Sequence, residues 1–191
     1  MAAKALRERG IKTLALLGEA PPDDCELQCP ATVVEGLAYL ASPGGPREEA
    51  GQGPGELLEK VKRAATDGLG GEADLWHIHN HSLGKNPILT EVVSKLSKEG
   101  YPLLLQIHDF AEDGRPKLYG RFSKETELYP RGEKTHYCLL NYRDYSILEK
   151  AGLKRERLHL LPNPIDFDLG HAPKENLILY PSRAIRRKNL G

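Results

Sequence analysis

The sequence predicts an α/β fold in which a parallel sheet is flanked by helices. Short, nearly continuous apolar runs such as "PLLLQIH" indicate strands that are buried on both faces. Longer stretches between them repeat apolar residues at helical spacing, and the two kinds of segment alternate. A chain of 191 residues is long enough for one domain with a core of its own.

The amino-terminal third begins with a helix and a strand. Residues 2–10 are typical of a helix that ends at Gly10, and "IKTLALLG" (11–18) follows as a short strand. Residues 19–54 are rich in Pro, Gly and acidic side chains around "ATVVEGLAYLA", whose strand pairing the pattern leaves open. Apolar residues at helical spacing then predict a helix from Pro54 to Gly68.

The rest of the chain repeats the strand and helix pattern. Strands are expected at "DLWHIH" (74–79), "PLLLQIH" (102–108), "THYCLL" (135–140) and "RLHLLP" (157–162), with helices at 86–100 and 141–152 between them. Ligands of parallel sheets bind beyond the carboxyl ends of the strands. The residues at those ends are Asn80, His81, His108, Asp109, Asn141 and Asn163.

The composition indicates which partners and which cellular setting suit the chain. Lys plus Arg and Asp plus Glu both number 27, so no bulk charge draws the chain to nucleic acid or to an anionic membrane. Cys25, Cys29 and Cys138 are an odd number in a sequence with no signal-peptide pattern and no membrane-spanning apolar run. These features predict a reducing, cytoplasmic setting, and free thiols are favoured over a zinc site.

The alternating histidines His77, His79 and His81 invite a metal site. On a strand rising about 3.3 Å per residue, the outer two would lie roughly 13 Å apart, whereas zinc ligands lie about 2.0 to 2.1 Å from the ion. All three therefore cannot share one ion on a regular strand. The pattern favours His77 as a hydrogen-bonded core residue and His79 and His81 as candidates for a substrate site, with no metal.

Two further segments carry charge that could meet a ligand. In "LILYPSRAIRRKNLG" (177–191) an apolar strand precedes Arg183, Arg186, Arg187 and Lys188, and such cations can neutralise a leaving diphosphate. Spacing alone favours a solvated basic loop. The long connection 109–134 carries Arg115, Lys117, Tyr119 and Arg121, which suit an anionic or polyhydroxylated acceptor as well as they suit a solvated loop.

Four motifs in order, "DLWHIHN", "LLLQIHDF", "LLPNPID" and "LILYPSRAIRRKNLG", resemble a glycosyltransferase of family 4 (group 1) with the GT-B fold. The resemblance implies two Rossmann-like domains that face each other across a cleft, a nucleotide-sugar donor as substrate, a retaining reaction, and neither cofactor nor metal. Residues 1–165 would form the acceptor-side domain, incomplete at its amino end. Residues 166–191 would form the interdomain crossing and the first strand and loop of the donor-binding domain.

The resemblance also assigns residues to roles. It implies that His108 reaches the donor sugar and that Arg183 and Lys188 grip the donor diphosphate, so these three residues would be catalytic. Asn163 and Asp166 match residues that stabilise the interdomain crossing. The residues expected to line the acceptor side of the cleft are His79, Asn80, His81, Asp109, Phe110 and Asn163.

The sequence departs from this family at both ends. The family has a strand and a glycine-rich loop before the first helix, and most of its second domain follows the basic loop. We therefore expect a missing central strand and a fragment that is inactive alone. The expected partners are a nucleotide-sugar donor and a sugar or other hydroxylated acceptor, without nucleic acid; peripheral membrane contact stays open and nothing indicates it. The alternatives are a nucleotide-sugar epimerase of the same fold, a non-catalytic sugar or nucleotide binder, and a metal hydrolase.

Overall fold

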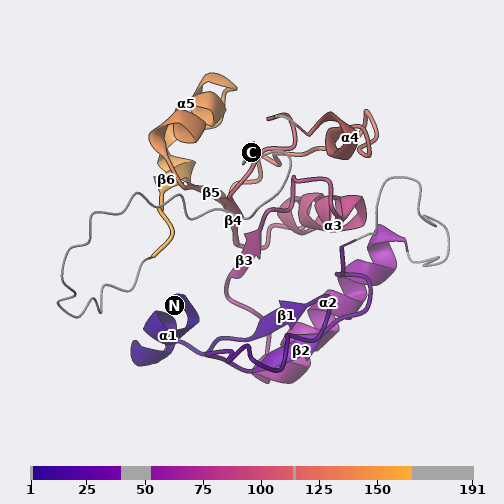
Figure 1. The fold of residues 1–191 in the computed structure, drawn as a ribbon, viewed down its shortest axis with the longest axis vertical. Coiled ribbons are helices and arrows are strands. Elements are labelled where there is room, and N and C mark those ends of the chain that lie inside the picture. The colour runs from indigo at the N-terminus through magenta and orange to yellow at the C-terminus, as the bar shows by residue number, and fades with distance from the viewer. Residues whose placement is uncertain (1, 40–52, 114, 165–191) are drawn as a thin grey trace, which may run out of the picture.

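The computed structural model describes residues 2–39, 53–113 and 115–164, and their fold is α/β (Figure 1). Every strand pair in it is parallel, which confirms the predicted fold class. In chain order the elements are α1 (Ala2–Glu8), β1 (Ala15–Leu17), β2 (Ala31–Val33), α2 (Pro54–Leu69), β3 (Trp76–His79), α3 (Pro87–Lys98), β4 (Leu103–Ile107), α4 (Pro116–Tyr119), β5 (Thr135–Leu139), α5 (Tyr142–Lys150), a 3-10 turn (Arg155–Arg157) and β6 (Leu158–Leu160).

The described strands form two sheets. The larger has the order β3-β4-β5-β6, so each strand lies beside the next one in the chain, and the smaller is the pair β1-β2. The island at 31–41, whose partner the sequence left open, supplies β2 and pairs with β1 in the register Ala15 to Ala31. Among the described residues, β3 pairs only with β4, so its other edge holds no described strand.

The core lies against one face of the larger sheet. The alternate residues Leu103, Leu105 and Ile107 of β4 are buried, and they belong to one apolar cluster with Val93 of α3 and Leu148 of α5. Because side chains alternate along a strand, the intervening residues lie on the opposite face. The register aligns His79, Gln106 and Cys138 on that second face, where His79 is exposed and the other two are buried.

The helix boundaries follow the capping residues of the sequence. The Oδ1 atom of Asn86 accepts a hydrogen bond from the N–H of Leu89 (3.1 Å), and Pro87 occupies the first position of α3. Asn141 caps α5 in the same way. The predicted end of α2 at Gly68 is one residue short, because the left-handed residue that ends the helix is Gly70 (φ 70°).

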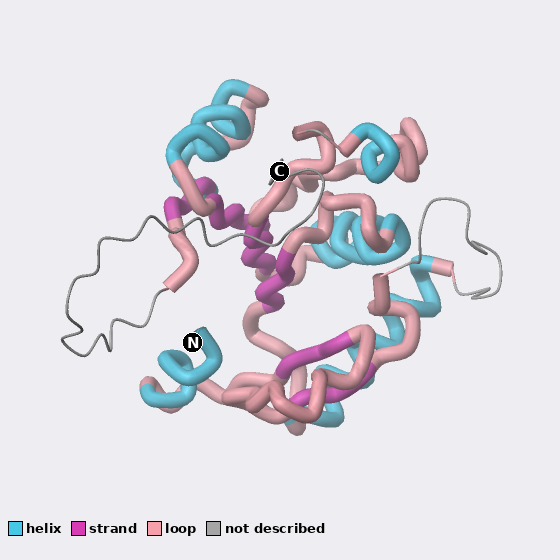
Figure 2. The backbone as a smooth tube through the Cα atoms, viewed as in Figure 1, coloured by secondary structure: helices cyan, strands magenta, loops and turns pink. Residues whose placement is uncertain are grey.

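The connection between β4 and β5 is mostly loop around the single turn of α4 (Figure 2). It docks closely against the loop before α3: a Cβ at Gly84 would lie 2.4 Å from the carbonyl oxygen of Leu118. Arg121 also donates to the Gly84 carbonyl (3.2 Å). The long connection is therefore held to the body of the domain beside the carboxyl end of β3.

Two predictions from composition can be compared with the described residues. Cys25, Cys29 and Cys138 are free cysteines, as the sequence analysis favoured for Cys25 and Cys29. Within the described ranges, no helix combines the length and the apolar character that a membrane crossing needs.

Candidate active site

The carboxyl ends of β3 and β4 are joined by one side chain. Asn80 follows β3, and its Oδ1 atom accepts hydrogen bonds from the backbone N–H groups of His108 (2.7 Å) and Asp109 (3.2 Å). Its own N–H donates to the carbonyl of Gln106 on β4 (2.9 Å). Three of the predicted site residues therefore lie together at this edge of the sheet.

Asn80 also has an unusual backbone. In the described part of the chain it is the only residue other than glycine with a positive φ, at 52°. Asparagine tolerates this left-handed conformation better than most residues do. The turn ends β3 and directs the following residue away from the line of the strand.

The imidazole rings of His79 and His108 are hydrogen-bonded. The distance from Nδ1 of His79 to Nε2 of His108 is 3.0 Å. Loss of solvating water, together with the nearby His77 and His108 rings, lowers the pKa of His79 to about 4. His79 is therefore uncharged near pH 7, so the two rings can share a single N–H donor between these nitrogens.

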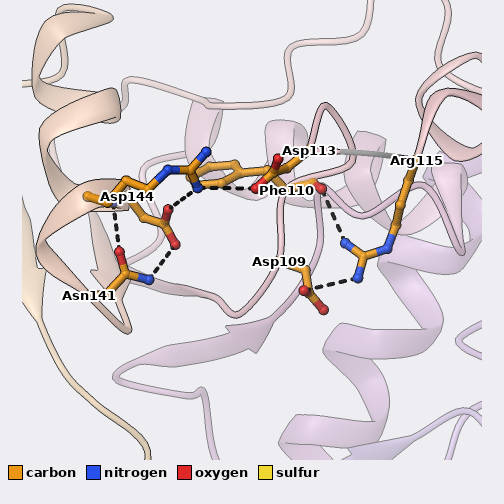
Figure 3. A network of polar contacts seen from close by, with 7 residues as sticks. Asp109, Phe110, Asp113, Arg115, Asn141 and Asp144 are labelled. Atoms are coloured by element: carbon orange, nitrogen blue, oxygen red, sulfur yellow. Dashed lines mark hydrogen bonds and ion pairs between the residues drawn. The ribbon is translucent and has the colours of Figure 1, made fainter. Parts of the chain in front are cut away.

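The loop after His108 is fixed by an ion pair. Arg115 lies 3.0 Å from an Asp109 carboxylate oxygen and also donates to the Phe110 carbonyl (3.3 Å) (Figure 3). The Phe110 side chain is buried and packs edge-on against Tyr129, so it anchors the loop in the core. The structure thus places Phe110 and Arg115 in supporting positions, whereas the Asp109 side chain stays half exposed.

A second polar network lies between the loop after β4 and the start of α5. Arg143 contacts carboxylate oxygens of Asp113 (3.1 Å) and Asp144 (3.2 Å), and Asn141 donates to Asp144 (2.8 Å) (Figure 3). This network ties the loop after β4 to the first turn of α5. The sequence analysis missed Asp113 and Arg143, since nothing in the local pattern shows that positions thirty residues apart would meet.

His77 and His81, the outer two of the alternating histidines, lie in different surroundings. His77 shares a hydrogen bond with the Oε1 atom of Gln106 (2.9 Å), as expected for a hydrogen-bonded residue, and burial lowers its pKa. His81 is 1% exposed and its Nε2 atom donates to the carbonyl of Leu128 (2.9 Å). The structure therefore places His81 in the interior, and not at the lip of a cleft as the sequence analysis expected.

Among the residues that the structure describes, no group of three or more His, Cys, Asp or Glu side chains is arranged to hold a metal ion. The unpaired Nδ1 atom of His81 is buried, and its Nε2 atom is engaged with a carbonyl. The candidate site is thus a polar cluster of His79, Asn80, His108 and Asp109.

The remaining candidates lie apart from this cluster or outside the described residues. Asn163 is exposed in the segment that follows β6, two strands away from β4 in the sheet. Asp166, Arg183 and Lys188 fall within 165–191, which the structure does not describe. Their expected contacts with the donor diphosphate and the interdomain crossing stay predictions.

A parallel sheet with polar side chains at its carboxyl edge is common to many classes of enzyme, so the fold alone does not identify a function. Comparison with curated proteins finds similarity to mannosylglucosyl-3-phosphoglycerate synthase from Petrotoga mobilis (strain DSM 10674 / SJ95), which is 33% identical. The match covers 71% of this chain and 32% of that protein, so the chain spans about a third of its relative's length. No protein-family model matches the chain, and no solved structure does.

Proposed function

We propose that this chain forms the acceptor side of the active site of a retaining glycosyltransferase of family 4 with the GT-B fold. The observation that carries the proposal is the cluster of His79, Asn80, His108 and Asp109 at the carboxyl edge of the sheet. The similarity to a synthase that is named for a glycosylated product supports the same class. The site would bind a nucleotide-sugar donor and a hydroxylated acceptor.

The reaction needs little from this domain beyond positioning. The bond between the anomeric carbon and the diphosphate oxygen breaks while the acceptor hydroxyl attacks from the same face and loses its proton to the departing phosphate. His108 contacts a hydroxyl of the donor sugar, and the neutral His79 orients the His108 ring. Arg183 and Lys188 hold the diphosphate as negative charge grows on it.

The acceptor class follows from the chemistry in the relative's name. Mannosylglucosyl-3-phosphoglycerate contains a phosphate and a carboxylate beside two sugars. We propose that the acceptor here is likewise an anionic glycoside, such as a glucosylated 3-phosphoglycerate. The long connection after β4 offers Lys117 and Tyr119, both exposed on α4, next to the loop that carries His108.

The proposal is tested with the native protein that contains these residues. GDP-mannose or UDP-glucose is supplied with glucosyl-3-phosphoglycerate, and the released nucleoside diphosphate is measured with and without the acceptor. Acceptor-dependent release and a product linkage with the donor's anomeric configuration, determined by NMR, are expected. Acceptor-independent conversion of the nucleotide sugar would instead indicate an epimerase. Binding of either compound without turnover would indicate a non-catalytic binder.

A further inference from the structure

We propose that Asn80 is a positioning residue that holds His108 against the donor sugar, an inference that rests on the function proposed for this site. The side chain comes from one strand end and fixes the first two residues beyond the neighbouring strand. A single Oδ1 atom meets both backbone N–H groups, so the orientation of the His108 backbone depends on it. The hydrogen bond between the rings of His79 and His108 then fixes the orientation of the His108 side chain.

Few residue types could do this at position 80. The φ of 52° excludes most side chains, because their Cβ atoms collide with the backbone in the left-handed region. Glycine adopts that conformation freely but has no oxygen to offer the two N–H groups. Aspartate is the closest replacement, since it tolerates the conformation and keeps an acceptor atom in the same place.

The consequence for transfer follows from geometry. Without the Asn80 oxygen, the N–H groups of His108 and Asp109 lose their acceptor, and the His108 ring keeps only its contact with His79. Reacting groups must be held close to their productive positions, and a displacement of about 1 Å can lower a rate on the order of 100-fold. Asn80 thus acts on the reaction through His108, without touching the substrate itself.

Hydrogen exchange tests, without any substrate, whether the Asn80 side chain holds these two N–H groups. In Asn80→Gly, the backbone amides of His108 and Asp109 should exchange hydrogen about tenfold faster than in the unsubstituted protein, as followed by NMR. In Asn80→Asp both amides should keep their protection. Asn141→Ala is the matched control, because it removes a side-chain acceptor at the end of the next strand and leaves these two amides bonded.

A kinetic measurement in the native protein tests the role in transfer. For Asn80→Gly we expect kcat to fall on the order of 100-fold with little change in KM for the acceptor. Asn80→Asp should restore most of the rate. The two measurements together separate positioning from folding. A variant that is merely less stable would lose amide protection across the whole domain, and not only at His108 and Asp109.

Each contrary outcome has a distinct meaning. Unchanged hydrogen exchange at His108 and Asp109 in Asn80→Gly would show that the Asn80 side chain does not hold these two N–H groups. Faster exchange with full transfer activity in the same variant would overturn its role in positioning while the proposed function stands. An unsubstituted protein that transfers sugar from no donor would overturn both the proposed function and this inference, before any variant is made.

Discussion

His81 shows what burial does to an ionisable side chain. Burial lowers its pKa to about 4 from an ordinary value of 6.5, and its hydrogen bond to the Leu128 carbonyl compensates only in part. The folded protein therefore resists protonation at this site, whereas the unfolded chain accepts a proton below about pH 6.5. The stability that His81 contributes is fully present above that pH and is lost as the pH falls toward 4.

We predict that the free energy of unfolding falls by roughly 3 kcal/mol between pH 7.5 and 4 on account of this one residue. His81→Gln keeps an N–H donor for the Leu128 carbonyl but does not titrate, so its unfolding free energy should depend less on pH. Urea unfolding at several pH values measures both slopes. Equal slopes for the two proteins would show that His81 does not govern acid stability.

At the residue scale, the sequence predicted where His79, Asn80, His108 and Asp109 would meet. The reason is simple: parallel strands end at the same edge, and each strand could be located by its apolar run. The placement of His81 could not be predicted in the same way. Alternation applies only while the strand continues, and the left-handed turn at Asn80 ends it one residue earlier.

At the scale of elements, Asn86 joins α3 to the loop after β2. Its side chain caps the helix at Leu89 and donates to the carbonyls of Gly36 (2.7 Å) and Ala38 (3.0 Å). The Asn86 residue is buried and its two carbonyl partners are partly buried, so water replaces these hydrogen bonds only in part when the side chain is removed. The sequence predicted a helix that starts at residue 86, but the two carbonyl contacts lie about fifty residues away and have no local signal.

We predict that Asn86→Ala lowers the free energy of unfolding by about 2 to 4 kcal/mol, because it removes the cap and leaves two partly buried carbonyls without this donor. Asn86→Ser keeps a capping oxygen and should lose about 1 kcal/mol less. Denaturant unfolding of both variants measures the difference. A loss below about 0.5 kcal/mol in Asn86→Ala, typical of a neutral surface change, would contradict this role.

At the scale of the whole molecule, the described strands leave one edge of β3 without a strand partner. Leu75, directly before this strand, is 54% exposed, which adds an apolar side chain to the edge. Unpaired edges of this kind pair readily with other chains.

We therefore predict that the 191-residue chain associates as its concentration rises, and that Leu75→Lys shifts it toward the monomer, because a charged residue at an edge opposes strand pairing. Sedimentation velocity over a range of concentrations measures the shift. Lys60→Ala, a change on α2 that leaves β3 and Leu75 as they are, should leave association unchanged. A chain that stays monomeric at every concentration would argue against an open edge.

The most direct test of the central claim compares a histidine at the carboxyl edge of the sheet with a histidine near the start of a strand. His108 directly follows β4 at its carboxyl edge, whereas His136 is the second residue of β5 and lies near its start. In the native protein, His108→Ala should reduce acceptor-dependent release of nucleoside diphosphate on the order of 100-fold or more, and His136→Ala should leave it nearly unchanged. Turnover in His108→Ala equal to that of the unsubstituted protein would contradict the assignment of this edge as the active site.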